Sequence, residues 1–249
     1  MPERRLFIDL GSSRLKWVWA KGPELERSSL GRGELKDFEH ALRDPAAPVP
    51  DTVWIASVAA PERTSQLARL CEQLWGMAPE LMESRAEEGG LYNVYSDASR
   101  LGVDRWLALL AAVRHHGKPV IAWDLGTATT LDAVDEAGRH LGGWILPGPG
   151  SMLSALGAGT RLAVPDQLGD GPVEPGRDTA HAISGGVLAA QLGALDRFCS
   201  AVAPRMARPP RIVATGGAAE RVGSLYPGAM LDPWLVFRGM LIRVEKNYM

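Results

Sequence analysis

Two segments of this chain, whose Asp-Leu-Gly triplets lie 115 residues apart, follow the same residue pattern. Residues 6–16 read Leu-Phe-Ile-Asp-Leu-Gly-Ser-Ser-Arg-Leu-Lys, and residues 120–130 read Val-Ile-Ala-Trp-Asp-Leu-Gly-Thr-Ala-Thr-Thr. Each combines an apolar run of the length of a buried strand with Asp-Leu-Gly and a tight turn of small, mostly hydroxylic residues. A single Asp-Leu-Gly is usually only a turn at a strand end. Two copies half a chain apart predict a duplicated α/β domain.

Both turns have the chemistry of a phosphate-binding site. Backbone N–H groups and hydroxyls of a glycine turn face an anion, and an aspartate holds a hydrated cation. We therefore predict a nucleotide in a cleft between the two domains. In the second copy the predicted phosphate loop consists of Asp124, Gly126, Thr127, Thr129 and Asp132. The alternative for each copy is a purely structural β-turn.

Composition limits the class of protein. The chain has 249 residues, of which 46% are hydrophobic and 22% charged, so two ordinary domains with their own cores are expected. The net charge of −2 gives no field that would draw the chain to nucleic acid or a membrane surface. Cys71 and Cys199 have no zinc-ligand spacing and fit buried thiols in a reducing compartment. Without a signal peptide or an apolar span, the chain is expected to be cytoplasmic.

The hydrophobic pattern places strands and helices around these loops. In the first half we expect a hairpin of residues 5–10 and 15–20, a strand at Val53–Val58, and helices at Arg63–Trp75 and Leu101–Val113. In the second half we expect a hairpin of 120–124 and 130–135, a glycine-rich loop at Gly142–Gly150, a strand at Arg211–Thr215, and helices from Ser151, over 178–202 and over 234–244. The predicted domains are 1–117 and 118–249, with the boundary near Gly117-Lys118-Pro119.

Five blocks spread over the chain together resemble the type III pantothenate kinases, a family of the acetate-kinase, sugar-kinase and actin-like superfamily. The blocks are Asp9–Lys16, Tyr95–Arg105, Asp124–Asp132, Gly142–Gly150 and Gly176–Gly186. The first and third indicate only the superfamily. Gly-x-Asp-Arg at residues 102–105 and Gly-x-x-Thr at residues 176–179 narrow the resemblance to this family.

The resemblance implies both a fold and a reaction. The fold would be two ribonuclease H-like (actin-like ATPase) α/β domains, each a mixed sheet flanked by helices. The reaction would be ATP-dependent phosphorylation of pantothenate to 4'-phosphopantothenate, the first step of coenzyme A biosynthesis. The implied cofactors are ATP, Mg²⁺ and a monovalent cation, K⁺ or NH₄⁺. The implied partners are pantothenate and a second copy of the chain in a homodimer.

The resemblance also assigns ATP and cation contacts. ATP would lie against Asp9, Leu10, Gly11, Ser12, Ser13, Arg14, Leu15, Lys16 and Thr127. Asp124 would hold the monovalent cation, and Asp9 would orient Mg²⁺ through water. Ser12 stands where the family normally has asparagine, which is also a short hydrogen-bonding residue.

Asp104 is the predicted general base. A primary alcohol is a poor nucleophile at pH 7, so a carboxylate within hydrogen-bond reach should accept its proton. Arg105 offers a guanidinium fork to the substrate carboxylate or a phosphate oxygen. The alternative is that Asp104 only caps the following helix, which is compatible with catalysis.

The predicted pantothenate contacts are Tyr95, Gly102, Val103, Asp104, Arg105 and Thr179. Tyr95 lies seven residues before Gly102, and Ala98 replaces a proline usual in the family. The resemblance implies that the Thr179 hydroxyl reaches pantothenate, either within its own subunit or from the neighbouring subunit. The alternatives are half-buried packing for Tyr95 and a helix N-cap for Asp178 and Thr179.

Gly142-Gly143 and Gly148-Pro149-Gly150 are expected to pass close to a ligand or a domain joint. The adenosine contact is expected at Thr215-Gly216-Gly217, after a strand, where the superfamily places that group. A simple strand-to-helix turn is the alternative there.

Two rival functions remain at this stage. One is another superfamily kinase, acting on a sugar or acetate, and the other is a non-catalytic regulatory protein on the same scaffold. Three carboxylates around one cleft, Asp9, Asp104 and Asp124, argue against a decayed site because they repel one another without cations.

Overall fold

The computed structural model describes residues 3–171 and 173–245. The chain divides into two compact units. The first lies within residues 1–111 and also contains the final helix, α6 (Leu235–Glu245), whereas the second is Ala112–Trp234. Helix α3 (Val103–His116) begins in the first unit and ends in the second. This division differs from the expected domains of 1–117 and 118–249 mainly in the placement of α6.

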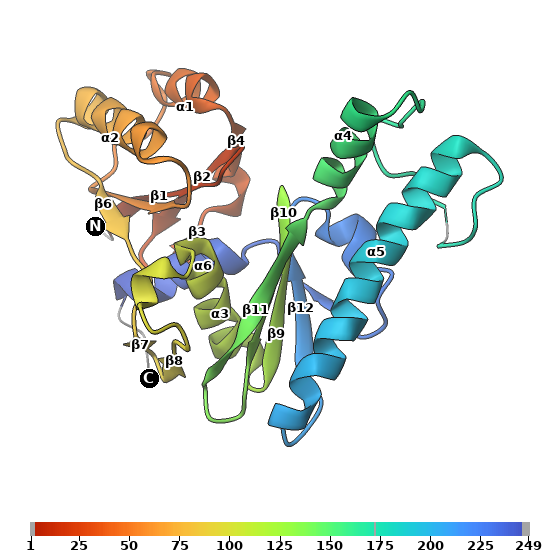
Figure 1. The fold of residues 1–249 in the computed structure, drawn as a ribbon. Coiled ribbons are helices and arrows are strands. Elements are labelled where there is room, and N and C mark those ends of the chain that lie inside the picture. The colour runs from red at the N-terminus through yellow and green to blue at the C-terminus, as the bar shows by residue number, and fades with distance from the viewer. Residues whose placement is uncertain (1–2, 172, 246–249) are drawn as a thin grey trace. The chain divides into compact units, whose positions relative to one another are not determined.

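The first unit is built on a mixed sheet (Figure 1). Its strands run in the order β3 (Glu24–Leu25), β2 (Leu15–Lys21), β1 (Arg4–Leu10), β5 (Thr52–Ser57) and β6 (Glu80–Met82), and β4 (Gly31–Gly33) also pairs with β2. Helices α1 (Leu35–Leu42) and α2 (Pro61–Trp75) bury their apolar residues against one face of this sheet. A small hairpin, β7 (Glu87–Glu88) and β8 (Leu91–Tyr92), and a short 3₁₀ helix at Ala98–Arg100 precede α3.

The second unit repeats the plan with larger helices. Its strand order is β11 (His140–Pro147), β10 (Ala128–Val134), β9 (Val120–Leu125), β12 (Arg211–Thr215) and β13 (Met230–Leu231). Helix α5 (Thr179–Val202) packs Leu188, Leu195 and Phe198 into the core formed with Ile121 and Trp123 of β9. Helix α4 (Pro149–Gly159) follows β11, and a one-turn π-helix, Ala219–Gly223, follows β12.

Strand pairing shows that the two sheets are copies of one design. In each sheet the first strand lies between an antiparallel and a parallel neighbour: β1 is antiparallel to β2 and parallel to β5, and β9 is antiparallel to β10 and parallel to β12. Asp9 pairs in register with Lys16 and Ala56, and Asp124 pairs with Thr130 and Thr215. Both aspartates therefore sit at the carboxyl end of a central strand, where open α/β sheets place ligands. The predicted duplication is confirmed.

One predicted element is wrong. Residues 142–147, expected to be loop, belong to strand β11, which pairs with β10 along its length. Glycine weakens a strand, but β11 is an edge strand whose partner β10 supplies the hydrogen bonds. Helix α1, capped by a reciprocal pair of Glu34 and Asp37, was not expected. No helix in the described ranges combines the length and apolarity needed to cross a bilayer.

Candidate active site

The first predicted phosphate turn, Gly11–Arg14, joins β1 to β2. The Gly11 N–H donates to the Arg14 carbonyl at 3.0 Å, and residues 12–14 are exposed. The Lys16 ammonium lies 3.8 Å from the Asp9 carboxylate across the two strands. Leu10 and Leu15, predicted ATP contacts, bury their side chains in the core, so only their backbone is available to a ligand.

Asp9 is an electrostatically unusual carboxylate. Its side chain is only 13% exposed, and burial raises its pKa to about 6. Lys16 opposes this rise, and the negative charge of Asp104 adds to it. Asp9, Lys16 and Asp104 therefore form one interacting group within the first unit.

Asp104 is held at the start of α3 by its neighbours. Its Oδ1 accepts the Arg105 backbone N–H at 2.8 Å. A Cβ on Gly102 would come within 2.6 Å of that same oxygen, so a larger residue there would push the Asp104 carboxylate aside. The buried Ser84 hydroxyl donates to the Leu101 carbonyl at 2.8 Å and fixes the entry to the helix.

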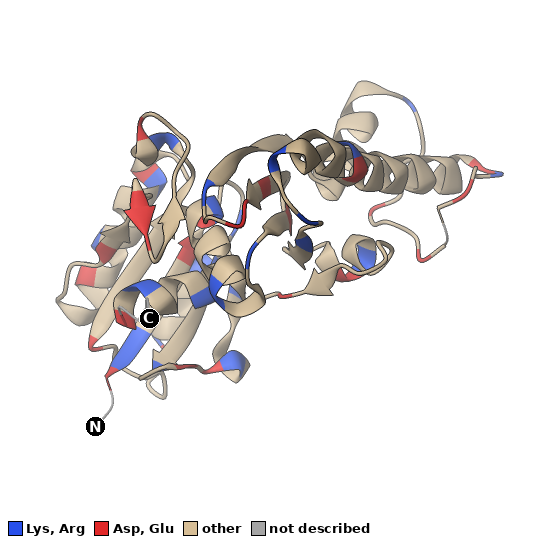
Figure 2. Ribbon diagram, turned by 90° about the horizontal axis from the view of Figure 1, so that it is seen from below, with Lys and Arg blue, Asp and Glu red and all other residues tan. Residues whose placement is uncertain are grey.

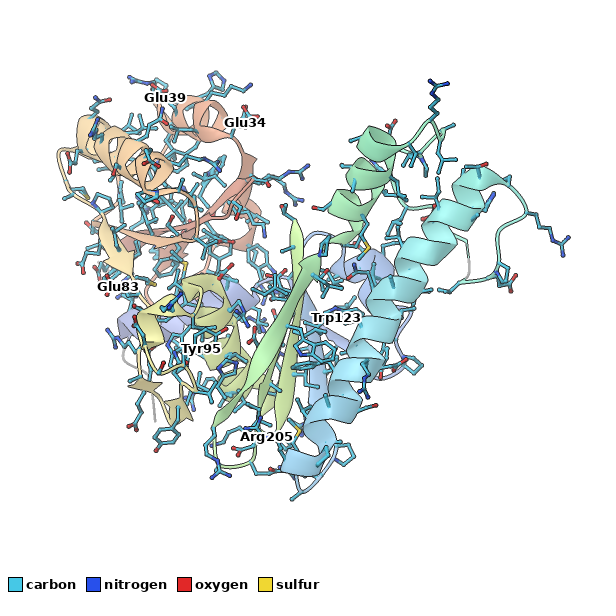
Figure 3. All side chains as sticks on the ribbon, viewed as in Figure 1. Glu34, Glu39, Glu83, Tyr95, Trp123 and Arg205 are labelled. Carbon is cyan, nitrogen blue, oxygen red and sulfur yellow. The ribbon has the colours of Figure 1, made fainter. Side chains whose placement is uncertain are left out.

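Arg105 and Tyr95 lie together in the first unit. Arg105 is 7% exposed, and its Nη1 donates to the Tyr95 hydroxyl at 3.4 Å. Figure 3 labels Tyr95 in the loop that precedes α3. Although Ala98 replaces the usual proline, the Asp97 carboxylate accepts the Ser99 N–H at 3.1 Å and its hydroxyl at 2.6 Å, which orders this loop.

Glu88 is a buried residue beside the site that the sequence did not single out. It accepts the Trp106 indole N–H at 2.8 Å and the Arg243 Nε–H at 2.9 Å. Because Trp106 follows Asp104 and Arg105 on α3 and Arg243 lies on α6, Glu88 ties both helices together. This network explains why α6 belongs to the first unit.

The second predicted phosphate turn is held in place by hydrogen bonds from the residues that follow β11. Thr127 is exposed at the tip, and its carbonyl accepts the Gly148 N–H at 2.9 Å and the Ser151 hydroxyl at 2.6 Å. A Cβ on Gly148 would lie 2.0 Å from the Gly126 carbonyl oxygen. The expected close approach at Gly148 is therefore to the Gly126–Thr127 backbone.

The Asp124 carboxylate is packed closely against Gly216 and Gly126. A Cβ on Gly216, which has a φ of +93°, would lie 2.3 Å from Asp124 Oδ1 and one on Gly126 would lie 3.5 Å away. That Cβ would also lie 2.6 Å from the Leu125 carbonyl carbon, so contacts within the protein and the positive φ explain why residue 216 is glycine, where we expected an adenosine contact. Nothing lies within 4 Å of a Cβ on Gly217.

Two residues placed in the second phosphate loop lie in β10 instead, with buried side chains. The Thr129 hydroxyl donates to Gln191 Oε1 at 2.7 Å, and the Asp132 carboxylate lies 2.8 Å from His140 Nε2. Both are at most 1% exposed, so they support the turn from inside the sheet. The expectation that they line the loop is wrong because strand pairing continues to Ala128.

The side chains at the predicted cation sites can be compared with what a cation requires. Among the described residues no cluster of three or more His, Cys, Asp and Glu side chains could hold a metal ion. The interacting carboxylates of Asp9 and Asp104 nevertheless suit a hydrated cation, which would relieve their repulsion. Asp124 is a half-buried carboxylate at the carboxyl end of β9, and a carboxylate oxygen is a ligand of the kind that a hard cation accepts.

Thr179 is the first residue of α5 and is exposed. The preceding Asp178 is the N-cap, and its carboxylate accepts the His181 backbone N–H at 2.9 Å. These bonds lower the Asp178 pKa. A pocket of about 310 Å³ beside this helix start is lined by residues that include Arg177, His181 and Ser184.

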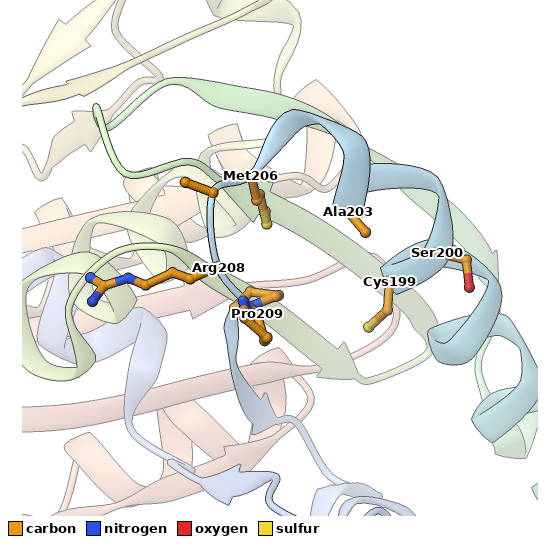
Figure 4. Close-up of a pocket in the computed structure, with 8 residues that line it drawn as sticks. Cys199, Ser200, Ala203, Met206, Arg208 and Pro209 are labelled. Atoms are coloured by element: carbon orange, nitrogen blue, oxygen red, sulfur yellow. The ribbon is translucent and has the colours of Figure 1, made fainter.

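A second pocket, of about 460 Å³, lies at the other end of α5 (Figure 4). It is lined by Cys199, Ser200, Ala203, Met206, Ala207, Arg208, Pro209 and Pro210. None of these is a predicted site residue. Acidic and basic residues are scattered over the ribbon, while helix α5 carries only Asp196 and Arg197 (Figure 2).

Solved structures similar to this one show the fold. A Baf-family protein of Campylobacter jejuni matches with a TM-score of 0.61 and 19% identity, covering 97% of this chain and 99% of its own. MreB 5 of Spiroplasma citri, bound to AMPPNP, matches with a TM-score of 0.51 and 10% identity over 98% of both chains. The protein has the actin-like ATPase fold.

Sequence comparisons identify the family. A family model described as type III pantothenate kinase matches residues 5–201. Relatives named type III pantothenate kinase include one from Cellvibrio japonicus, 34% identical over 240 residues and 94% of each chain. Another, from Paracidovorax citrulli, is 35% identical over 257 residues and 98% of each chain. With matches of this extent, the chain belongs to the type III pantothenate kinase family.

Proposed function

We propose that this protein transfers the γ-phosphoryl group of ATP to the hydroxyl of pantothenate and so forms 4'-phosphopantothenate for coenzyme A biosynthesis. The observation that carries the proposal is the grouping of Asp9, Lys16 and Asp104 in one unit, beside the Arg105–Tyr95 pair. Phosphoryl transfer requires positioned phosphates, compensated charge and an oriented nucleophile more than covalent help from the protein. These residues supply those functions.

The two duplicated turns bind the phosphates of ATP in this proposal. The exposed backbone and hydroxyls of Ser12, Ser13 and Thr127 donate to phosphate oxygens, and Lys16 offsets their charge. Asp9 would hold Mg²⁺ through water, and Asp124 would hold K⁺ or NH₄⁺. When bound, these cations neutralise charge on the phosphates and on the carboxylates that face them.

Asp104 accepts the proton of the pantothenate hydroxyl as attack proceeds. Arg105 binds the pantothenate carboxylate or a phosphate oxygen, with Tyr95 holding its guanidinium. Thr179 contributes a hydroxyl to pantothenate. The homodimer implied by the family resemblance stays a prediction, and so does the cytoplasmic location.

The raised pKa of Asp9 predicts a pH dependence. Asp9 must be ionised to hold a cation, so kcat/KM for Mg-ATP should fall as the pH drops through about 6. For the folding stability of the ligand-free protein, the pH has the opposite effect. The folded state retains the proton between the ordinary pKa of 3.8 and about 6, so folding stability declines as the pH rises through that window.

Asp9→Asn tests both halves of this prediction. At pH 7 the variant should lose most activity, yet its ligand-free form should be more stable by on the order of 2–3 kcal/mol, at about 1.4 kcal/mol per pKa unit. This gain should vanish near pH 4 in melting curves. An equal effect of the substitution at both pH values would contradict the assignment.

A coupled assay of ADP release tests the activity directly. With millimolar ATP, Mg²⁺ and K⁺ or NH₄⁺, turnover should require pantothenate and should not occur with acetate or a sugar. Omitting the monovalent cation should reduce the rate. Turnover with acetate or a sugar alone would favour another kinase of the superfamily, and no turnover with any acceptor would favour a regulatory protein on this scaffold.

A further inference from the structure

Arg63 joins the first turn of α2 to the first phosphate turn. Its Nη1 donates to the backbone carbonyl of Ser12, 51 residues earlier in the sequence. Arg63 is partly buried, whereas Ser12 is exposed. The family resemblance drew no attention to Arg63, because it lies outside all five blocks.

The fold explains how this contact arises. Leu10 pairs in register with Ser57, and the Val58 N–H donates to the Leu10 carbonyl at 3.1 Å, so β5 ends beside the start of the turn. Helix α2 begins at Pro61, and the hydroxyls of Ser57 and Thr64 lie 2.6 Å apart. This bond fixes the first turn of α2 against the end of β5, and Arg63 is the residue before Thr64.

The charge of Arg63 is not neutralised by a neighbour. In the part of the chain that the structure describes, no carboxylate lies within ion-pair distance of its guanidinium, while Lys16 lies 3.8 Å from Asp9. A guanidinium has five N–H donors in a planar fork, and one is used by Ser12. The remaining donors and the full positive charge therefore stand at the edge of the phosphate turn.

We propose that Arg63 is a further phosphate-binding residue, which fixes the Gly11–Arg14 turn and presents its guanidinium to the outer phosphates of ATP. Arginine suits this role because its fork matches two phosphate oxygens at once. The proposal rests on the proposed function insofar as the turn binds ATP. In this proposal the phosphates meet two positively charged side chains, Arg63 from α2 and Lys16 from β2.

Nucleotide binding tests the proposal without turnover. Arg63→Gln should weaken Mg-ATP binding roughly 10-fold or more, the range for a charge-assisted hydrogen bond, and Arg63→Lys should lose less. AMP, which lacks the outer phosphates, should bind both forms equally. Arg69→Gln, an exposed arginine on the same helix, removes the same charge and should bind ATP as the wild type does.

Other results would contradict the proposal. ATP affinity within twofold of the wild type would overturn the proposal, as would equal losses for ATP and AMP. A lower melting temperature without nucleotide, together with unchanged affinity, would reduce Arg63 to a structural tether. Because no acceptor is present, these outcomes are independent of whether pantothenate is the substrate. Failure of the wild type to bind ATP at all would instead refute the proposed function.

Discussion

Replacing Asp104 with asparagine is expected to lower kcat for pantothenate by roughly 10²-fold or more, the range for removal of a general base. The amide cannot accept the proton of the hydroxyl, although its size and position at the start of α3 are kept. The affinity for Mg-ATP should change far less than kcat, since Asp9 and the turns proposed to bind phosphate are unchanged. Steady-state rates of ADP release, with each substrate varied in turn, measure both quantities.

A matched control separates catalysis from a change in net charge. Asp44→Asn makes the same chemical change in an exposed loop, where the carboxylate accepts the nearby Ala46 N–H at 2.8 Å, and it should leave kcat as in the wild type. If Asp104→Asn retained wild-type kcat, Asp104 would be a helix-start residue and nothing more.

Gly148→Ala, just before α4, should displace the Gly126–Thr127 turn of the second unit. The added Cβ would lie 2.0 Å from the Gly126 carbonyl oxygen and 2.7 Å from that of Thr127. Both are backbone atoms, so the turn must move. Overpacking of this kind costs about 1–3 kcal/mol, which corresponds to a melting temperature lower by roughly 3–10 °C in a chain of this size.

The same substitution should also raise KM for ATP, because Thr127 sits in the displaced turn. Gly150→Ala provides the control two residues away, since nothing lies within 4 Å of a Cβ at that position. Gly148 has a φ of −68°, which any residue adopts, so backbone strain cannot explain a difference between the variants. Equal melting temperatures and KM values for the two variants would contradict the packing described here.

Much of the fold could be predicted from local patterns. The hairpin of β1 and β2 and strand β12 follow from apolar runs beside glycine turns, and α2 ends at Gly76 in the left-handed conformation that glycine favours. Strand β11 was missed because Gly142 and Gly143 usually mark a loop, whereas here they lie in an edge strand. Its pairing with β10 decides its structure, and pairing between strands is not a local property.

Long-range contacts also decided where α6 belongs. Its sequence predicts a helix, but only the structure shows Arg243 bonded to the buried Glu88 and Gly239 packed against the Leu107 backbone. A Cβ on Gly239 would lie 2.1 Å from the Leu107 carbonyl oxygen. Neither partner is near α6 in sequence, so the expected domain of 118–249 could not anticipate the return of the chain to the first unit.

In the candidate site, too, some residues could be predicted from the sequence and others could not. Motif spacing singled out Asp9, Lys16, Asp104, Arg105 and Tyr95, and the structure gathers them in one unit. Spacing alone could not separate exposed Thr127 from buried Thr129, because both are threonines of one motif. Arg63 carried no sequence signal, since its role depends on a contact between α2 and a turn 51 residues away.

A crystal structure with pantothenate and a non-hydrolysable ATP analogue would test the central claim most directly. We expect the pantothenate hydroxyl oxygen to lie about 2.6–3.2 Å from an Asp104 carboxylate oxygen, the reach of a general base. Its other side should face the terminal phosphate of the analogue. A hydroxyl that contacts no carboxylate, or one bonded to Asp9 with Asp104 turned away, would contradict the mechanism.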